Sequence, residues 1–296
     1  MCIMPEGLIL KGVGGFYYVE TAGHVSVCRA RGIFRKEGLT PVPGDYAVIS
    51  EEADGTGTVE EILPRKNLLA RPPMANIDQL VIVVSVCEPV PNALVLDQTI
   101  AAAEDRGIEP VLVFSKIDLH DAAPYFDIYR KAGFPVFCIS SQTGEGVDSV
   151  EAALKGKIIA FTGNSGVGKS SLLNRMFSQF HLETGEISHK LGRGRHTTRQ
   201  VELLKLESGK YIADTPGFSS VDMENCASIT KDSLPYCFRE FVPSLGGCKF
   251  VSCSHTCEKG CAVLEAVRSG EISRSRHESY TAMYREIDSR KEWSKK

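Results

Sequence analysis

A glycine-rich segment followed by lysine and serine has the residue types that bind nucleotide phosphates. It matches G-x-x-x-x-G-K-[ST] at every fixed position and consists of Gly163, Asn164, Ser165, Gly166, Val167, Gly168, Lys169 and Ser170, followed by Ser171. Glycines let the backbone curl so that successive N–H groups point at the phosphates. Lys169 supplies a charge at the β- and γ-phosphates, and Ser170 supplies a hydroxyl for Mg²⁺. The apolar run before this segment and the helical pattern after it provide the strand and helix that a P-loop requires.

Two further segments could complete a magnesium and γ-phosphate site. Asp214 and Gly217 belong to the sequence Asp-Thr-Pro-Gly at the end of a predicted strand. There a carboxylate can hold Mg²⁺ through water, and the N–H of Gly217 can reach a γ-phosphate. The basic loop 192–199 carries Thr197, to which we assign a Mg²⁺ contact, with Thr198 as an open alternative. A solvated basic loop without this role remains the simpler interpretation.

The same basic loop contains a histidine that could assist hydrolysis. Many GTPases place glutamine directly after D-x-x-G, where it orients the attacking water. Here that position is Phe218, whose side chain can neither donate nor accept a hydrogen bond. The neutral imidazole of His196 can accept a proton or bind a water near pH 7. We therefore predict that His196 is the catalytic residue, with contact to RNA as the alternative.

Two loops earlier in the chain have the features of guanine recognition. Ser115, Lys116 and Asp118 lie in S-K-I-D, which is similar to N-K-x-D, and the Asp118 carboxylate would accept hydrogen bonds from guanine N1–H and its amine. Ser140 and Ser141 begin a loop similar to S-A-x-x-G, whose backbone N–H contacts guanine O6. Each loop follows a predicted strand, and the carboxyl ends of strands are where α/β sheets bind ligands.

A cluster of cysteines near the C-terminus has the spacing of a metal site. Cys248, Cys253, His255 and Cys261 supply four ligands, enough for a closed tetrahedral Zn²⁺ site, while Cys257 is a fifth candidate. A short cysteine-rich segment has little apolar core of its own, so a structural metal would stabilise it. Reduced cysteines packed in a small core are the alternative.

The predicted elements divide the chain into three parts. Short β-branched and aromatic runs before residue 63 predict about five strands, typical of a small OB-type barrel, at 8–13, 16–20, 25–30, 46–50 and 57–62. The segment 67–76 is interpreted as a linker. Beyond it, strands alternating with helices predict a parallel α/β sheet covered on both faces. A cysteine-rich segment and a charged helical tail follow.

Composition excludes several classes of protein. The 296 residues carry 34 Lys and Arg against 37 Asp and Glu, a net charge of −3, so a uniformly basic nucleic-acid coat is excluded while a local basic patch is not. The apolar run 80–87 is far shorter than the ~20 residues of a membrane helix. No signal-peptide pattern begins the chain, so we expect a cytoplasmic protein that binds no membrane.

The order of the motifs is the most specific feature. Ordinary GTPases run from phosphate loop to switches and then to base loops, whereas here the base loops come first, which indicates a circular permutation. With the G-R-H-T-T loop at 194–198, D-T-P-G-F at 214–218 and the metal cluster, the chain resembles the RsgA (YjeQ/YloQ) family of ribosome-assembly GTPases. Ser115 departs from the asparagine that is usual in this family, and the family pattern omits Cys257 from the zinc ligands.

The resemblance implies a multidomain α/β protein with three parts. Residues 1–70 would form an OB-fold RNA-binding barrel, 71–220 a circularly permuted P-loop GTPase domain, and 221–296 a zinc-binding domain with a helical tail. The implied activity is hydrolysis of GTP to GDP and phosphate, stimulated by the 30S ribosomal subunit during its late assembly. Implied partners are that subunit with its 16S rRNA, one structural Zn²⁺ per chain, and Mg²⁺ with GTP; we expect a monomer.

Two rival functions and one open question remain at the level of sequence. The chain could be a passive RNA-binding module that nucleotide merely stabilises, or a P-loop ATPase. Basic residues of the tail could contact rRNA phosphates or simply line a solvated helix. They are Arg268, Arg274, Arg276, Arg285, Arg290, Lys291, Lys295 and Lys296.

Overall fold

The computed structural model describes residues 4–52, 54–177, 201–214 and 226–293. These residues divide into two compact units. One unit contains residues up to Gln79 together with Lys155–Thr162 and part of 187–216. The other contains Leu80–Leu154, part of 163–186 and the C-terminal region.

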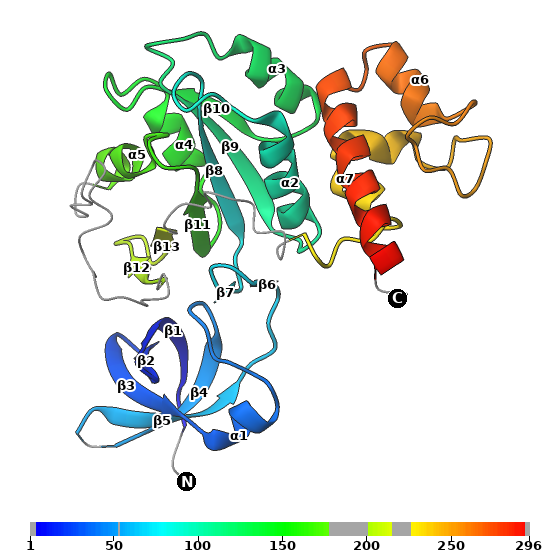
Figure 1. Cartoon of the computed structure of the whole chain (residues 1–296). Coiled ribbons are helices and arrows are strands. Elements are labelled where there is room, and N and C mark those ends of the chain that lie inside the picture. The colour runs from blue at the N-terminus through cyan, green and yellow to red at the C-terminus, as the bar shows by residue number, and fades with distance from the viewer. Residues whose placement is uncertain (1–3, 53, 178–200, 215–225, 294–296) are drawn as a thin grey trace. The chain divides into compact units, whose positions relative to one another are not determined.

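The N-terminal strands close into a barrel, as the sequence predicts (Figure 1). The strand order is β1-β2-β3-β5-β4, and a short helix α1 (Gly32–Lys36) follows β3. Alternating apolar side chains face inward, and Ile9, Val19 and Ile49 are fully buried. The strands are β1 (Glu6–Val13), β2 (Phe16–Thr21), β3 (His24–Ala30), β4 (Tyr46–Glu51) and β5 (Thr56–Ile62).

The segment after the barrel is an ordered hairpin rather than the linker expected from its prolines and asparagines. Strands β6 (Leu68–Leu69) and β7 (Met74–Ala75) pair in antiparallel fashion. The buried Asn67 exchanges two hydrogen bonds with the backbone of Ile77, and Asn76 donates to the Gly44 carbonyl at 2.8 Å. The asparagine side chains therefore satisfy backbone groups, which composition alone does not reveal.

A six-stranded sheet lies beyond the hairpin, in the order β10-β9-β8-β11-β13-β12. β9 pairs with β10 and β11 pairs with β13 in parallel, as expected, while the edge strand β12 is antiparallel to β13 because a short turn joins them. All five residues of β11 are buried, in keeping with a sheet covered on both faces. The strands are β8 (Gln79–Ser85), β9 (Glu109–Ser115), β10 (Val136–Ile139), β11 (Ile158–Thr162), β12 (Leu203–Lys205) and β13 (Tyr211–Asp214).

Four helices alternate with these strands. Figure 1 shows α2 and α3 on one face of the sheet and α4 and α5 on the other. The Asn92 side chain caps α2 by accepting a hydrogen bond from the Val95 N–H, and α5 begins directly after the P-loop. The helices are α2 (Ala93–Glu104), α3 (Ala123–Lys131), α4 (Val147–Ala153) and α5 (Lys169–Met176).

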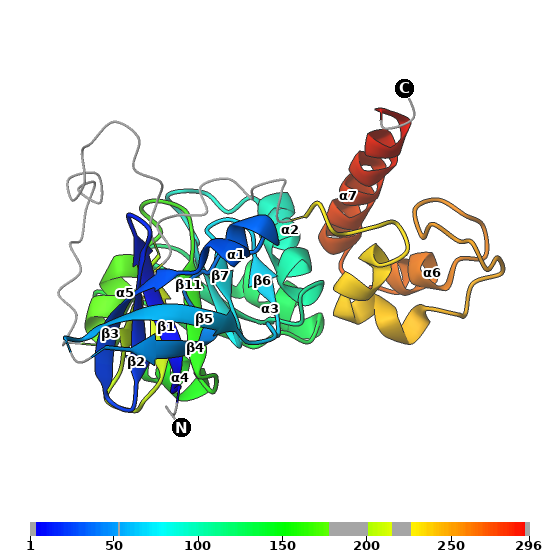
Figure 2. The ribbon, with the colours of Figure 1, turned by 90° about the horizontal axis from the view of Figure 1, so that it is seen from below.

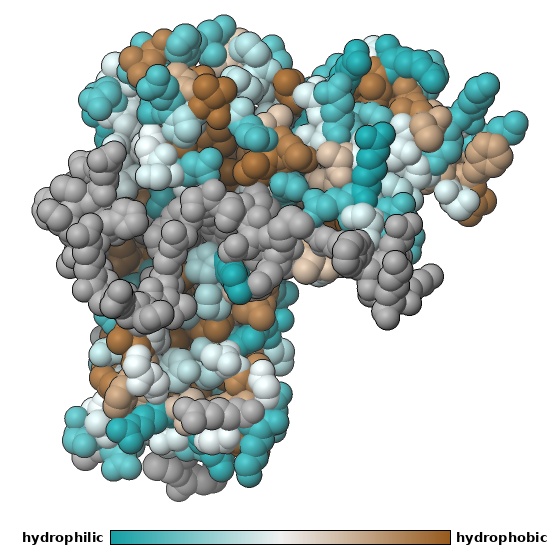
Figure 3. Space-filling view, viewed as in Figure 1, coloured by the Kyte–Doolittle hydropathy of each residue, from teal (hydrophilic) through white to brown (hydrophobic). Residues whose placement is uncertain are grey.

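The C-terminal region combines short helices and irregular loops with the long helix α7 (Figure 2). Its core includes Phe238, Phe241 and Tyr280, whose rings pack with centroids 4.9–5.3 Å apart. Hydrophilic side chains cover much of the described surface on the face in Figure 3, with smaller hydrophobic areas between them. The helical elements are η2 (Leu234–Cys237), η3 (Arg239–Ser244), α6 (Ala262–Arg268) and α7 (Arg274–Trp293).

Among the described residues, no helix is long and apolar enough to cross a membrane.

Candidate nucleotide and metal sites

The phosphate-binding segment has the backbone of a tight loop between β11 and α5. A Cβ on Gly163 would lie 2.5 Å from the Val83 carbonyl oxygen, so only glycine fits there. Gly166 and Gly168 have φ of 80° and 91°, and Gly168 caps the start of α5. Lys169 and Ser170 therefore begin a helix, where backbone N–H groups are oriented for an anion.

The first predicted base loop contacts the P-loop directly. Ser115 is 1% exposed, and its Oγ donates to the Val167 carbonyl at 2.5 Å. Serine in place of asparagine thus still reaches the phosphate loop. Lys116 has φ of 64° and its Nζ donates to the Glu88 carbonyl, while Asp118 is exposed in the turn that follows β9. Asp118 is open to a ligand, as a base-reading carboxylate requires.

The second predicted base loop lies beside the first. The Ile117 N–H donates to the Ile139 carbonyl at 3.3 Å, which joins the loops after β9 and β10. Ser140 is fully buried and organises its loop, because its Oγ accepts from the Thr143 N–H and its carbonyl from the Gly144 N–H. The adjacent Ser141 is partly buried. The structure therefore brings Ser115, Lys116, Ser140 and the P-loop together.

The remaining predicted nucleotide contacts are only partly described. Asp214 is the last residue of β13, in register with Phe161 of β11, so its backbone lies at the carboxyl end of the sheet. Gly217, Thr197, Thr198 and the predicted catalytic His196 fall outside the described residues. Their roles stay predictions.

The predicted metal ligands converge on one point. The ligand atoms of Cys248, Cys253, His255 and Cys261 all lie within 4.8 Å of one another. His255 Nδ1 is 3.5 Å from the sulfurs of Cys248 and Cys261. The exposed Cys257 is not part of this cluster. Three thiols and one imidazole suit the tetrahedral coordination of Zn²⁺, so the cluster could hold a zinc ion.

Neighbouring groups orient the ligands of this Cys₃His cluster. The Ala262 N–H donates to the Cys248 sulfur at 3.4 Å, and a ring nitrogen of His277 hydrogen-bonds the His255 carbonyl at 2.8 Å. Burial raises the pKa of the Cys253 thiol to about 12, so the thiolate that a metal needs would form at neutral pH only with a cation nearby.

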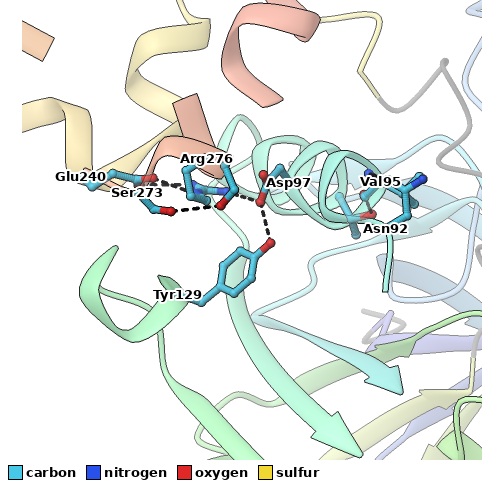
Figure 4. Close-up of polar contacts among 9 residues, drawn as sticks. Asn92, Val95, Asp97, Tyr129, Glu240, Ser273 and Arg276 are labelled. Atoms are coloured by element: carbon cyan, nitrogen blue, oxygen red, sulfur yellow. Dashed lines mark hydrogen bonds and ion pairs between the residues drawn. The ribbon is translucent and has the colours of Figure 1, made fainter. Parts of the chain in front are cut away.

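Arg276 of the tail fits neither predicted alternative, since it is not exposed to rRNA and does not line a solvated helix face. Arg276 is 1% exposed, because its guanidinium binds Asp97 of α2 at 2.6 Å and Glu240 of η3 at 2.7 Å (Figure 4). Tyr129 of α3 donates to the same Asp97 oxygen at 3.0 Å. Burial alone would lower the pKa of Arg276, but the two carboxylates raise it, so the guanidinium stays charged. Sequence reasoning missed this network because its members lie far apart in the chain.

The base loops precede the P-loop in the chain but lie beside it in space, which defines a circularly permuted P-loop GTPase with an N-terminal barrel. A model of the RsgA GTPase matches residues 62–224, and a model of the RsgA N-terminal domain matches residues 6–59. The chain belongs to the RsgA GTPase family.

Individual relatives agree with this membership over nearly the full chain. A protein of Caldanaerobacter subterraneus named small ribosomal subunit biogenesis GTPase RsgA is 46% identical over 95% of both chains. One of the same name from Geobacillus thermodenitrificans is 44% identical over 97% of this chain and 99% of its own. The crystal structure of YjeQ from Thermotoga maritima matches with a TM-score of 0.80 at 34% identity, covering 96% of this chain and 98% of that one. The crystal structure of YloQ, a circularly permuted GTPase, gives 0.79 at 35%, covering 97% and 96%.

Proposed function

We propose that this protein hydrolyses GTP to GDP and phosphate during late assembly of the small ribosomal subunit. The observation that carries the proposal is the 2.5 Å contact from Ser115 to Val167, because it joins a base-reading loop to a P-loop that follows it in the chain. Relatives at 42–46% identity that carry the name small ribosomal subunit biogenesis GTPase support the biological role.

Within this proposal each part of the site has one task. Asp118 reads the guanine edge, the stem of Lys116 covers the ring, and the loop that begins at Ser140 and Ser141 approaches the guanine O6. Lys169 and the loop amides bind the phosphates. Ser170 and Thr197 contact Mg²⁺, with Asp214 behind a water and the Gly217 N–H at the γ-phosphate. His196 orients the attacking water.

The proposal extends to a metal and to partners. Cys248, Cys253, His255 and Cys261 would hold one structural Zn²⁺, which closes the site with four protein ligands and leaves no open position for catalysis. The barrel and tail would bind 16S rRNA of the 30S subunit in the cytoplasm. Both base loops and the P-loop come from one chain, which supports action as a monomer. Domain limits of 1–70, 71–220 and 221–296 remain part of this proposal.

Phosphate release from GTP, measured with and without purified 30S subunits, tests the function. We expect slow release alone and faster release with subunits. No release in either case would favour the passive RNA-binding module, and equal competition by ATP for GTP binding would favour the ATPase.

A separate test addresses the catalytic histidine. His196→Ala should slow single-turnover hydrolysis while GTP and 30S affinities are kept. If only 30S affinity falls and saturating subunits restore the rate, His196 contacts RNA instead.

A further inference from the structure

One arginine connects the P-loop helix to the second base loop. Arg175 lies in the last turn of α5, the helix that begins with Lys169 and Ser170. Its Nη1 donates to the carbonyls of Ser141 at 3.2 Å and Gln142 at 3.3 Å, and its Nη2 donates to the carbonyl of Thr143 at 3.1 Å. Three consecutive carbonyls thus point at a single guanidinium.

These contacts fix which way the loop amides point. In a planar trans peptide the C=O and N–H point in opposite directions. Because the Ser141 carbonyl points at Arg175, the N–H of Gln142 points away from it. In the described part of the chain no residue accepts a hydrogen bond from this N–H. Gln142 is exposed. The loop therefore keeps this N–H available to an acceptor outside the protein.

The loop is shaped to receive the guanidinium. Gly144 has φ of 93°, and a Cβ there would lie 2.3 Å from Arg175 Nη2. Glycine at 144 therefore permits both the turn and the close approach of Arg175.

Ser115 and Arg175 join different pairs of loops. Ser115 ties the first base loop to the P-loop through Val167. Its side chain is short, and among the described residues its Oγ contacts only the carbonyls of Val84 and Val167. The tie from the phosphate side to the second base loop is made by Arg175 instead.

We infer that Arg175 is a positioning residue for guanine specificity, because it holds loop 140–144 with the Gln142 N–H turned toward the base. It touches neither base nor phosphate. This inference rests on the proposed GTPase function and names a residue that sets the nucleotide preference of the same site.

The test compares Arg175→Ala with Arg175→Lys in the full-length protein. The matched control is Arg130→Ala, which also removes an exposed arginine from the last turn of a helix but contacts no base loop. Affinities for GDP, ADP and inorganic pyrophosphate are measured for each, together with kcat and KM for GTP. Arg175→Ala should weaken GDP about tenfold and leave pyrophosphate unchanged, because the displaced loop would lose about one hydrogen bond to the base. KM should rise while kcat is kept, and lysine should restore part of the affinity.

A double-mutant cycle tests the contact itself. Gly144→Ala should weaken GDP binding in the wild-type chain, and less so in Arg175→Ala, where the steric conflict with the guanidinium is gone.

Several outcomes would overturn the inference. Unchanged GDP affinity in Arg175→Ala would do so, and so would an equal loss of GDP and pyrophosphate, which would mean that the whole helix had loosened. A wild-type protein without preference for GDP over ADP would instead overturn the proposed function, so the two failures are distinguishable.

Discussion

The N-terminal barrel and the C-terminal region are stabilised in different ways. The barrel closes its strands on one another, and its core consists mostly of aliphatic side chains such as Ile9, Val19 and Ile49. The C-terminal region packs 3₁₀ helices, loops and the helices α6 and α7 around a cluster of cysteines, three aromatic rings and the buried Arg276. In the barrel, hydrogen bonds between paired strands satisfy the polar groups of the backbone. An irregular segment depends instead on side-chain contacts or a bound metal for its stability.

The side-chain contacts that join each of these two regions to the α/β elements also differ in how exposed they are. Glu20 of the barrel accepts hydrogen bonds from Lys205 of β12 at 2.5 Å and Tyr211 of β13 at 2.6 Å, and about half of the Lys205 side chain is exposed. The Arg276 network with Asp97 and Glu240 is at most 5% exposed. Water and salt screen the first link far more than the second. We expect the C-terminal region to be sensitive to single substitutions and the barrel link to be tolerant.

The largest effect should follow loss of the metal cluster. Cys253→Ala removes one of the four ligands of the proposed zinc site, and structural zinc contributes about 10–16 kcal/mol of apparent binding free energy in zinc-finger peptides. We expect loss of bound zinc and of the C-terminal fold, with GTP affinity nearly kept. Zinc content and circular dichroism check this. Cys257→Ala, outside the cluster, should retain zinc. A Cys253→Ala protein that also retains zinc would contradict the claim that the C-terminal region depends on this cluster for its stability.

The next effect should follow removal of the buried guanidinium. Arg276→Met leaves Asp97 and Glu240 buried without their cation, and breaking such a pair costs about 3–5 kcal/mol. The midpoint of urea unfolding should therefore shift to a lower urea concentration. Arg274→Met on the same helix is the control, because its side chain is 87% exposed and its i,i+4 pair contributes only ~0.5 kcal/mol or less. Equal shifts in the two variants would contradict a structural role for the network.

Loss of the barrel link should have a smaller effect. Glu20→Gln replaces the charge that Lys205 and Tyr211 share, and exposed ion pairs contribute about 0.2–1 kcal/mol. The loss in unfolding free energy should shrink in high salt. Glu61→Gln, on the exposed side of β5, should change nothing. If Glu20→Gln lost more unfolding free energy than Arg276→Met, the barrel link would be the stronger of the two, contrary to our expectation.

The smallest effect is the pH dependence of that barrel link. Burial alone would raise the pKa of Glu20, but hydrogen bonds from Lys205 and Tyr211 lower it below the ordinary 4.5. A carboxyl with a lowered pKa stabilises the fold above its unfolded pKa, and this contribution disappears as pH falls through the folded pKa. The stability difference between wild type and Glu20→Gln should therefore be present at pH 7 and vanish in acid. If the stability difference persisted at the lowest pH, its cause would be side-chain packing rather than the charge of Glu20.

Local patterns predicted the barrel, the alternating sheet and the P-loop, because each is a short run with its own period or spacing. The four predicted metal ligands also lie close in sequence, and the structure brings them together. Partners far apart in the chain could not be predicted. Arg276 is 179 positions from Asp97, so its helix gave no sign that this arginine is buried rather than exposed like Arg274. The hairpin after the barrel was missed since its asparagines bond to backbone rather than to water.

The loop between Cys248 and Cys253 has a practical consequence. It contains four residues, among them Phe250, half exposed, and Val251, fully exposed. Proteases cleave segments that can unfold locally into their active sites. With the proposed zinc bound to Cys248 and Cys253, the loop could not extend in this way, although its aromatic residue is on the surface. Chymotrypsin should therefore spare the bond after Phe250 while the metal is bound and cut it once a chelator has removed the metal. The fragments of this one cut, seen on a gel, would then report how much of a preparation lacks the metal.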